Sequence, residues 1–199
     1  MSDYVNITNP YGDIWICENF LNDEERNTLF NFAKNSTEDE WSLRYIKDRS
    51  LEASYKYELG SDEWKETVEH RNNFWDDKII EIPKEYKNIT DNIWNKTNLF
   101  FKGQYKITEY MTIQRQYTGE ELKVHDDRGY KTTLERAIVI YLNEDYNGGE
   151  IWFPQHDVSY KPKAGSLISF PGTDEYLHGV KAVTEGPTRF ALSNFCYSK

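Results

Sequence analysis

The hydrophobic pattern of this chain changes period near residue 103, and this change constrains the fold more than any other feature. Before it, apolar residues recur at helical spacing. After it, short apolar or alternating runs are separated by Gly and Pro residues. The runs predicted as strands are 111–117, 136–142, 150–153, 165–170, 179–183 and 189–197. Short strands spaced in this way are typical of a sandwich or jelly roll.

Three helices are predicted in the first half of the chain. Asn22 is a suitable N-cap, and Glu25 stands three residues later, where it can complete a capping box. A second helix is expected from Ser61, and a third from about residue 84 to 101. The predicted fold class is therefore mainly β with flanking helices (α+β), in which N-terminal helices pack on one sheet of a double-sheet core.

Length and composition indicate one folded domain. The chain has 199 residues, of which 16% are aromatic, and disordered chains are poor in aromatics. We expect a single domain at 1–199, with a mostly helical support region at 1–103 and a jelly-roll core at 104–199. The net charge of −10 argues against nucleic acid as a partner.

Compartment is predicted from what the sequence lacks. It has no signal peptide, no run of about 18 apolar residues and only two cysteines, Cys17 and Cys196. We therefore expect a cytoplasmic protein without a membrane partner, whose two thiols stay free; a single disulfide is the alternative.

Two histidines and an aspartate have the spacing of a metal site. His125 and Asp127 are two residues apart, so in an extended segment both side chains point to the same face. His178 follows beside a predicted strand, and two His with one carboxylate form the facial triad of non-haem Fe(II) enzymes. Asp126 is the alternative carboxylate, although it would face the opposite way. The spacing alone is also compatible with two ordinary histidines.

Arg189 lies 11 residues after His178, inside the last predicted strand. If Ala191 and Ser193 face the interior, Arg189 does too, and a buried guanidinium needs an anionic partner. The alternative is a surface arginine that pairs with one of the many acidic residues.

With these residues in place, the chain resembles the Fe(II)- and 2-oxoglutarate-dependent oxygenases, in particular their prolyl 4-hydroxylase-like branch. The resemblance is carried by ordered pieces: FLNDEE at 20–25, YTG at 117–119 with HDD at 125–127, IYLN at 140–143 with GGEIWFP at 148–154, KPKAGSLISF at 161–170, and HGV at 178–180 with Gly186 and Arg189. It covers roughly residues 12–35 and 105–197.

The resemblance implies a fold, a site and a reaction. The fold is a double-stranded β-helix, and His125, Asp127 and His178 would bind Fe(II). Arg189 and Tyr141 would hold the distal carboxylate of 2-oxoglutarate, and Tyr117 and Ser193 would line its pocket. The implied enzyme is a dioxygenase that uses O2 to hydroxylate a C–H bond and releases succinate and CO2, with ascorbate as an open further requirement.

The resemblance leaves the substrate open. It favours a prolyl residue in a peptide or protein, with small molecules as the alternative, and the segment 47–57 is a candidate substrate loop. Two other functions are weighed. An AlkB-type nucleic-acid demethylase usually has a second arginine six residues after the first, where this chain has Phe195. A catalytically silent jelly-roll binding module would be expected to lack a ligand or the cation, yet all are present.

Overall fold

The computed structural model describes residues 7–43, 61–62, 78–108, 111–128 and 133–199. In chain order the elements are β1 (Ile7–Tyr11), β2 (Ile14–Cys17), α1 (Asp23–Asn35), η1 (Glu38–Glu40), β3 (Ser42–Leu43), β4 (Lys78–Glu81), η2 (Lys84–Tyr86), α4 (Lys87–Phe100), β5 (Lys106–Ile107), β6 (Thr112–Gln116), β7 (Leu122–His125), β8 (Leu134–Tyr141), β9 (Asn147–Gly148), β10 (Ile151–Phe153), β11 (Val158–Tyr160), β12 (Leu167–Pro171), η3 (Asp174–Tyr176), β13 (His178–Val180), β14 (Val183–Glu185) and β15 (Arg189–Tyr197).

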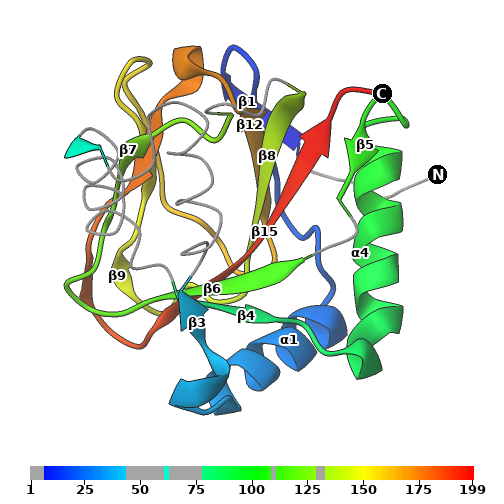
Figure 1. Ribbon diagram of the computed structural model, residues 1–199, viewed down its shortest axis with the longest axis vertical. Coiled ribbons are helices and arrows are strands. Elements are labelled where there is room, and N and C mark those ends of the chain that lie inside the picture. The colour runs from blue at the N-terminus through cyan, green and yellow to red at the C-terminus, as the bar shows by residue number, and fades with distance from the viewer. Residues whose placement is uncertain (1–6, 44–60, 63–77, 109–110, 129–132) are drawn as a thin grey trace.

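Two sheets form the body of the protein. The larger has nine strands in the order β1-β2-β12-β8-β15-β6-β4-β3, with β5 added beside β15. The smaller has four strands in the order β11-β10-β13-β7, and β14 pairs with β9 in a separate ribbon. Figure 1 shows α1 and α4 on one side of the larger sheet and β7 on the other. The predicted jelly roll with helices on one sheet is confirmed.

The central strands of the larger sheet are buried on both faces, and successive residues enter opposite cores because their side chains point to opposite sides. On β8, Ile138 and Ile140 belong to the core shared with the helices, whereas Ala137 and Tyr141 belong to the core between the sheets. The same alternation on β15 places Leu192 in the first core and Ala191 in the second. This alternation decides which residues reach the interior between the sheets.

The N-terminal half contributes strands as well as helices. Strands β1 to β4 extend the larger sheet on both sides, and the sequence pattern did not predict them. The expected strand at 179–183 is divided into β13 and β14, because its two ends pair with different strands. The helix expected from Ser61 lies outside the described residues from position 63 onward, and so does the candidate substrate loop at 47–57.

Helix α1 begins with the predicted capping box. The Asn22 side chain accepts a hydrogen bond from the Glu25 backbone N–H (2.9 Å), and the Glu25 carboxylate accepts one from the Asn22 backbone N–H (3.0 Å). Glu25 is buried, and it also accepts hydrogen bonds from Asn92 and Lys96 of α4, each at 2.5 Å. One carboxylate thus caps the first helix and joins it to the second.

The two cysteines are free and buried, as expected from the sequence. Burial raises the pKa of Cys17 to about 11 and that of Cys196 to about 12, which leaves both thiols protonated and unreactive at neutral pH. No helix in the described part of the chain combines the length and the apolar character needed to cross a bilayer.

The Glu25 junction predicts a large cost for its removal. Glu25→Ala should lower the free energy of unfolding by about 3 kcal/mol, because it leaves the Lys96 ammonium and the Asn22 N–H without their shared acceptor. Urea denaturation measures this loss. Glu24→Ala, which removes an exposed carboxylate from the same helix turn, is the matched control and should cost little. Equal losses from the two substitutions would contradict the role given to Glu25.

Candidate metal centre

The pairing of β13 with β7 brings the two predicted histidine ligands together. The strands are antiparallel, and their register places His178 directly opposite His125. Residues opposite each other in such a pair point to the same face of the sheet. The ring centroids of the two imidazoles are 4.4 Å apart.

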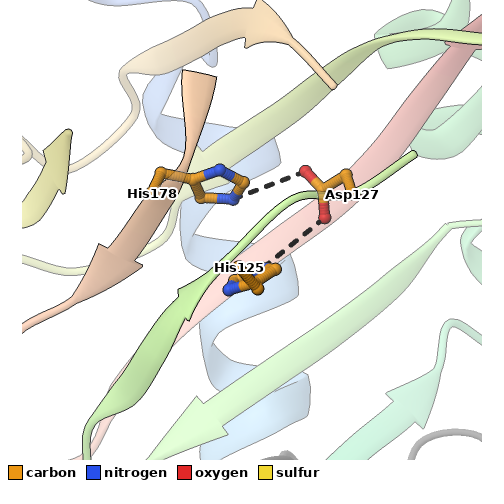
Figure 2. Close-up of side chains that lie close together, drawn as sticks. All are labelled: His125, Asp127 and His178. Carbon is orange, nitrogen blue, oxygen red and sulfur yellow. Dashed lines mark ion pairs between the residues drawn. The ribbon is translucent and has the colours of Figure 1, made fainter. Parts of the chain in front are cut away.

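Asp127 completes the group, two residues beyond His125. Its Oδ1 lies 3.7 Å from Nε2 of His125, and its Oδ2 lies 3.4 Å from Nε2 of His178. Figure 2 shows the carboxylate facing both rings. One ligand atom from each residue lies within 4.8 Å of the others, a spacing that could hold a metal ion. Within the described residues this group contains Asp127 and not Asp126.

Backbone carbonyls fix the orientation of both imidazole rings. Nδ1 of His125 lies 2.7 Å from the carbonyl oxygen of Lys123, and Nδ1 of His178 lies 3.1 Å from that of Tyr176. A carbonyl only accepts hydrogen bonds, so each Nδ1 carries the proton and donates it. Each Nε2 is then left with a lone pair directed toward the centre of the group. This second hydrogen bond is the usual way in which a protein orients a metal-binding histidine.

The surroundings keep His178 neutral. Burial lowers its pKa to about 4, although the Asp127 carboxylate opposes this shift. The rings of Phe170 and Phe153 lie against it, with centroid distances of 4.3 and 5.8 Å. A neutral imidazole is the form that binds a metal, and apolar walls exclude water from the centre. Two nitrogens and one carboxylate therefore suit a divalent metal and leave other coordination positions open.

The turn that carries Asp127 is held by the next residue, Arg128. Its backbone N–H donates to the carbonyl of Gly172, and its Nε donates to the carbonyl of Leu134, both at 2.8 Å. A Cβ on Gly172 would lie 2.3 Å from Cδ2 of the buried Leu134 side chain, so a larger residue here would displace that side chain. The sequence marks Gly172 as a turn residue, but it carries no signal for Arg128.

A cavity extends from the metal-binding group into the space between the sheets. Its lining includes the three candidate ligands together with Tyr141, Arg189 and Ser193, and it is completed by Gln114, Leu122, Ala137, Ile138, Val139, Ile151, Val180 and Phe195. Arg189 is only 3% exposed and has no ion pair within the described residues. Its guanidinium carbon is 5.2 Å from the ring centroid of Tyr141. Nε of Arg189 and the hydroxyl of Tyr141 are both buried without a hydrogen-bond partner in the described structure.

This arrangement indicates an anion site. A buried cation without a counter-ion is costly, and a carboxylate can accept hydrogen bonds from both the guanidinium and the phenol. The cavity thus combines three metal-ligand side chains with a cation and a hydroxyl. It fits a ligand that chelates a metal through one end and carries an anionic group at the other.

Of the two remaining predicted residues, Ser193 lies in the cavity lining and Tyr117 does not. Ser193 lines the cavity, where its Oγ receives a hydrogen bond from Gln114 at 3.3 Å. Tyr117 is 37% exposed and is absent from the cavity lining. Its hydroxyl lies 3.2 Å from the Glu38 carboxylate, and its ring stacks on the guanidinium of Arg115.

Asn143 holds the backbone on both sides of Arg189, and the sequence analysis assigned it no role. Its Nδ2 donates to the carbonyl of Thr188 (2.9 Å), and its Oδ1 accepts from the N–H of Phe190 (2.9 Å). Because these two residues flank Arg189, Asn143 fixes the position from which the arginine side chain enters the cavity.

Comparison with known proteins gives one family match. Residues 110–197 match the model of the 2OG-Fe(II) oxygenase superfamily, and this segment contains the candidate metal ligands and Arg189. Prolyl 3-hydroxylase 2 from Mus musculus and from Homo sapiens are each 43% identical to this chain over 60 residues. That segment is 28% of this chain and only 8% of either relative.

Solved structures share the fold. A viral collagen prolyl hydroxylase from Paramecium Bursaria Chlorella virus-1, solved as a 2OG complex, has a TM-score of 0.65 and 19% identity over 94% of this chain and 97% of its own. A prolyl-4-hydroxylase from Pseudomonas putida has a TM-score of 0.63 and 17% identity over 94% and 93%. A prolyl hydroxylase from Trichoplax adhaerens, in complex with a hypoxia inducible factor peptide fragment, has a TM-score of 0.62 and 18% identity over 94% and 84%.

The metal-binding group predicts that loss of one ligand strongly weakens metal binding. His178→Ala should weaken Fe(II) binding by at least about 100-fold, because it leaves one imidazole and one carboxylate. Anaerobic equilibrium dialysis measures the bound iron. His156→Ala is the control, because His156 bonds to the carbonyl of Glu175 outside this group. Retained stoichiometric iron in the His178 variant would remove this residue from the site.

The role of Asn143 predicts a cost in stability. Asn143→Ala should lower the free energy of unfolding by about 2 kcal/mol, since it leaves the buried N–H of Phe190 without an acceptor. Asn147→Ala, at an exposed position, should change it by much less. Thermal or urea denaturation compares the two variants, and indistinguishable losses would refute the proposed anchoring.

Proposed function

We propose that this chain, whose residues 110–197 match the model of the 2OG-Fe(II) oxygenase superfamily, is a 2-oxoglutarate- and Fe(II)-dependent dioxygenase that hydroxylates a prolyl residue in a peptide or protein. The observation that carries this proposal is one cavity that joins two kinds of site. His125, Asp127 and His178 lie along it, and it also reaches Arg189, a buried cation without an ion pair among the described residues. A 2-oxo dicarboxylate has the chemistry to occupy both sites at once.

Each residue has a defined task in this reaction. His125, Asp127 and His178 would hold Fe(II) through Nε2, a carboxylate oxygen and Nε2. Bound Fe(II) supplies the chelation of the 2-oxo acid and the activation of O2. Arg189 pairs with the distal carboxylate of 2-oxoglutarate, and the hydroxyl of Tyr141 donates to the same group.

The protein also controls the surroundings of the reaction. Phe153 and Phe170 shield His178 from water, and the carbonyls of Lys123 and Tyr176 keep each Nε2 directed inward. The overall reaction is balanced: 2-oxoglutarate, O2 and a C–H bond give succinate, CO2 and an alcohol. The proposal needs no oxidant besides O2.

Names of relatives support a prolyl substrate. The matched sequence relatives are named prolyl 3-hydroxylases. The structural neighbours at 17–19% identity support the fold alone. The resemblance found in the sequence favours 4-hydroxylation, whereas the 43% identity over 60 residues favours 3-hydroxylation. Both positions of the proline ring therefore enter the test.

The substrate experiment uses the complete chain with Fe(II), 2-oxoglutarate and proline-containing peptides. We expect succinate formation that depends on the peptide, together with a peptide that gains one oxygen atom. Amino-acid analysis against authentic 3- and 4-hydroxyproline identifies the position. Asp127→Gly should abolish both products while the protein stays folded. Peptide-independent succinate formation, with other substrates oxidised instead, would overturn the prolyl assignment.

Arg189 provides the test of the co-substrate site. Arg189→Ala should weaken 2-oxoglutarate binding by about 100-fold or more, because it removes a buried charge partner worth several kcal/mol. Isothermal titration of the Fe(II)-loaded protein under anaerobic conditions measures the affinity. Lys163→Ala is the control, since Lys163 is largely exposed and pairs with Glu18. Unchanged affinity in the Arg189 variant would show that another residue supplies the cation.

A further inference from the structure

A second tyrosine, Tyr146, lies beside Arg189 and was not predicted from the sequence. It belongs to the loop between β8 and β9 and is only 3% exposed. A Cβ added to Gly149 would lie 2.7 Å from Cε2 of Tyr146 and 3.2 Å from Cδ of Arg189. The tyrosine ring and the arginine side chain therefore pack side by side in space that exists because residue 149 is glycine.

Lys161 helps to fix the position of Tyr146. The Lys161 ammonium donates to the carbonyls of Tyr146 (2.7 Å) and Gly148 (2.5 Å), and it lies 3.9 Å from the centroid of the Tyr146 ring. Gly186 allows the turn between β14 and β15 to approach closely, because a Cβ there would lie 2.9 Å from Cα of Tyr146. The phenol is thus held on several sides.

The hydrogen-bond donors around Arg189 lack an acceptor. The hydroxyls of Tyr141 and Tyr146 and Nε of Arg189 are all buried and have no hydrogen-bond partner among the described residues. Burial raises the pKa of both tyrosines, and the neighbouring Arg189 guanidinium opposes this rise without cancelling it. Both phenols are therefore protonated at neutral pH. A guanidinium cannot accept a hydrogen bond. The group that satisfies all three is an anion with more than one oxygen.

We propose that Tyr146 is a second hydroxyl donor, together with Tyr141, to the carboxylate that pairs with Arg189, and that its hydroxyl adds to the affinity for 2-oxo acids that carry this carboxylate. This rests on the proposed function, because it assigns the anion to the distal carboxylate of 2-oxoglutarate. A carboxylate offers about four lone-pair positions, enough for the guanidinium fork and two phenols. A ligand with a methyl group at the same place would leave all these donors unpaired.

The test compares two ligands that differ only in the group at this end. 2-Oxovalerate has the five-carbon chain of 2-oxoglutarate, with a methyl group in place of the distal carboxylate. Tyr146→Phe should weaken 2-oxoglutarate binding by about tenfold or more, the usual effect of losing a hydrogen bond to a charged group. Its affinity for 2-oxovalerate should stay unchanged. Anaerobic calorimetry with the Fe(II)-loaded protein gives both dissociation constants.

Two further measurements keep the result interpretable. Tyr105→Phe, at a tyrosine that packs on Phe101 away from the cavity, should alter neither affinity. The apo Tyr146→Phe protein should melt at the same or a higher temperature than the wild type, since the hydroxyl it loses has no partner to be left unsatisfied. A lower melting temperature would indicate a structural hydrogen bond and would overturn the proposal.

The remaining outcomes separate the inference from the function it rests on. Equal weakening of both ligands by Tyr146→Phe, or no weakening of either, would overturn the role of Tyr146 while leaving the oxygenase proposal intact. A wild-type protein that binds 2-oxoglutarate no better than 2-oxovalerate would instead refute the anion site at Arg189 altogether.

Discussion

The positions of the side chains inside this protein depend on the alternation along two central strands, β8 and β15. Both faces of these strands are buried, one against the helices and the other against the smaller sheet. A shift of one residue in either strand would exchange the two faces. A shift in β8 would move Tyr141 out of the cavity, and a shift in β15 would move Arg189 out and bring Leu192 in. The apolar side of each strand thus fixes the register that the polar side needs for function.

The site lowers the stability of the unliganded protein. Nε of Arg189 and the hydroxyls of Tyr141 and Tyr146 are buried without a hydrogen-bond partner among the described residues, and each such donor costs free energy in the unliganded protein. Asn143 and Lys161 anchor the backbone beside these groups, and Gly149 leaves the space that they occupy. Such a cost is expected where a protein prepares donors for a ligand that it does not always contain. Ligand binding then offsets this cost, because the ligand supplies the acceptors that these donors lack.

The sequence predicts local features well where the evidence is itself local. The capping box of Asn22 and Glu25, the span of β15 and the grouping of His125, Asp127 and His178 all depend on short spacings or on a strand with a clear pattern. Tyr117 could have been placed by the same means. It shares its strand face with Ile113 and Arg115, on the helix side, and not with Gln114, which lines the cavity.

Features that depend on tertiary contacts were missed. Strands β2 and β4 are short and are recognisable only through the strands that they join. Arg128 and Tyr146 gain their roles from backbone that approaches from Gly172 and Gly149, far along the chain or across a turn.

The central claim is that one ligand spans the metal group and Arg189. Anaerobic visible absorption tests it most directly, as Fe(II) and then 2-oxoglutarate are added. We predict a charge-transfer band that appears only with both and is absent in His178→Ala; a folded wild-type protein that develops no band would contradict the claim.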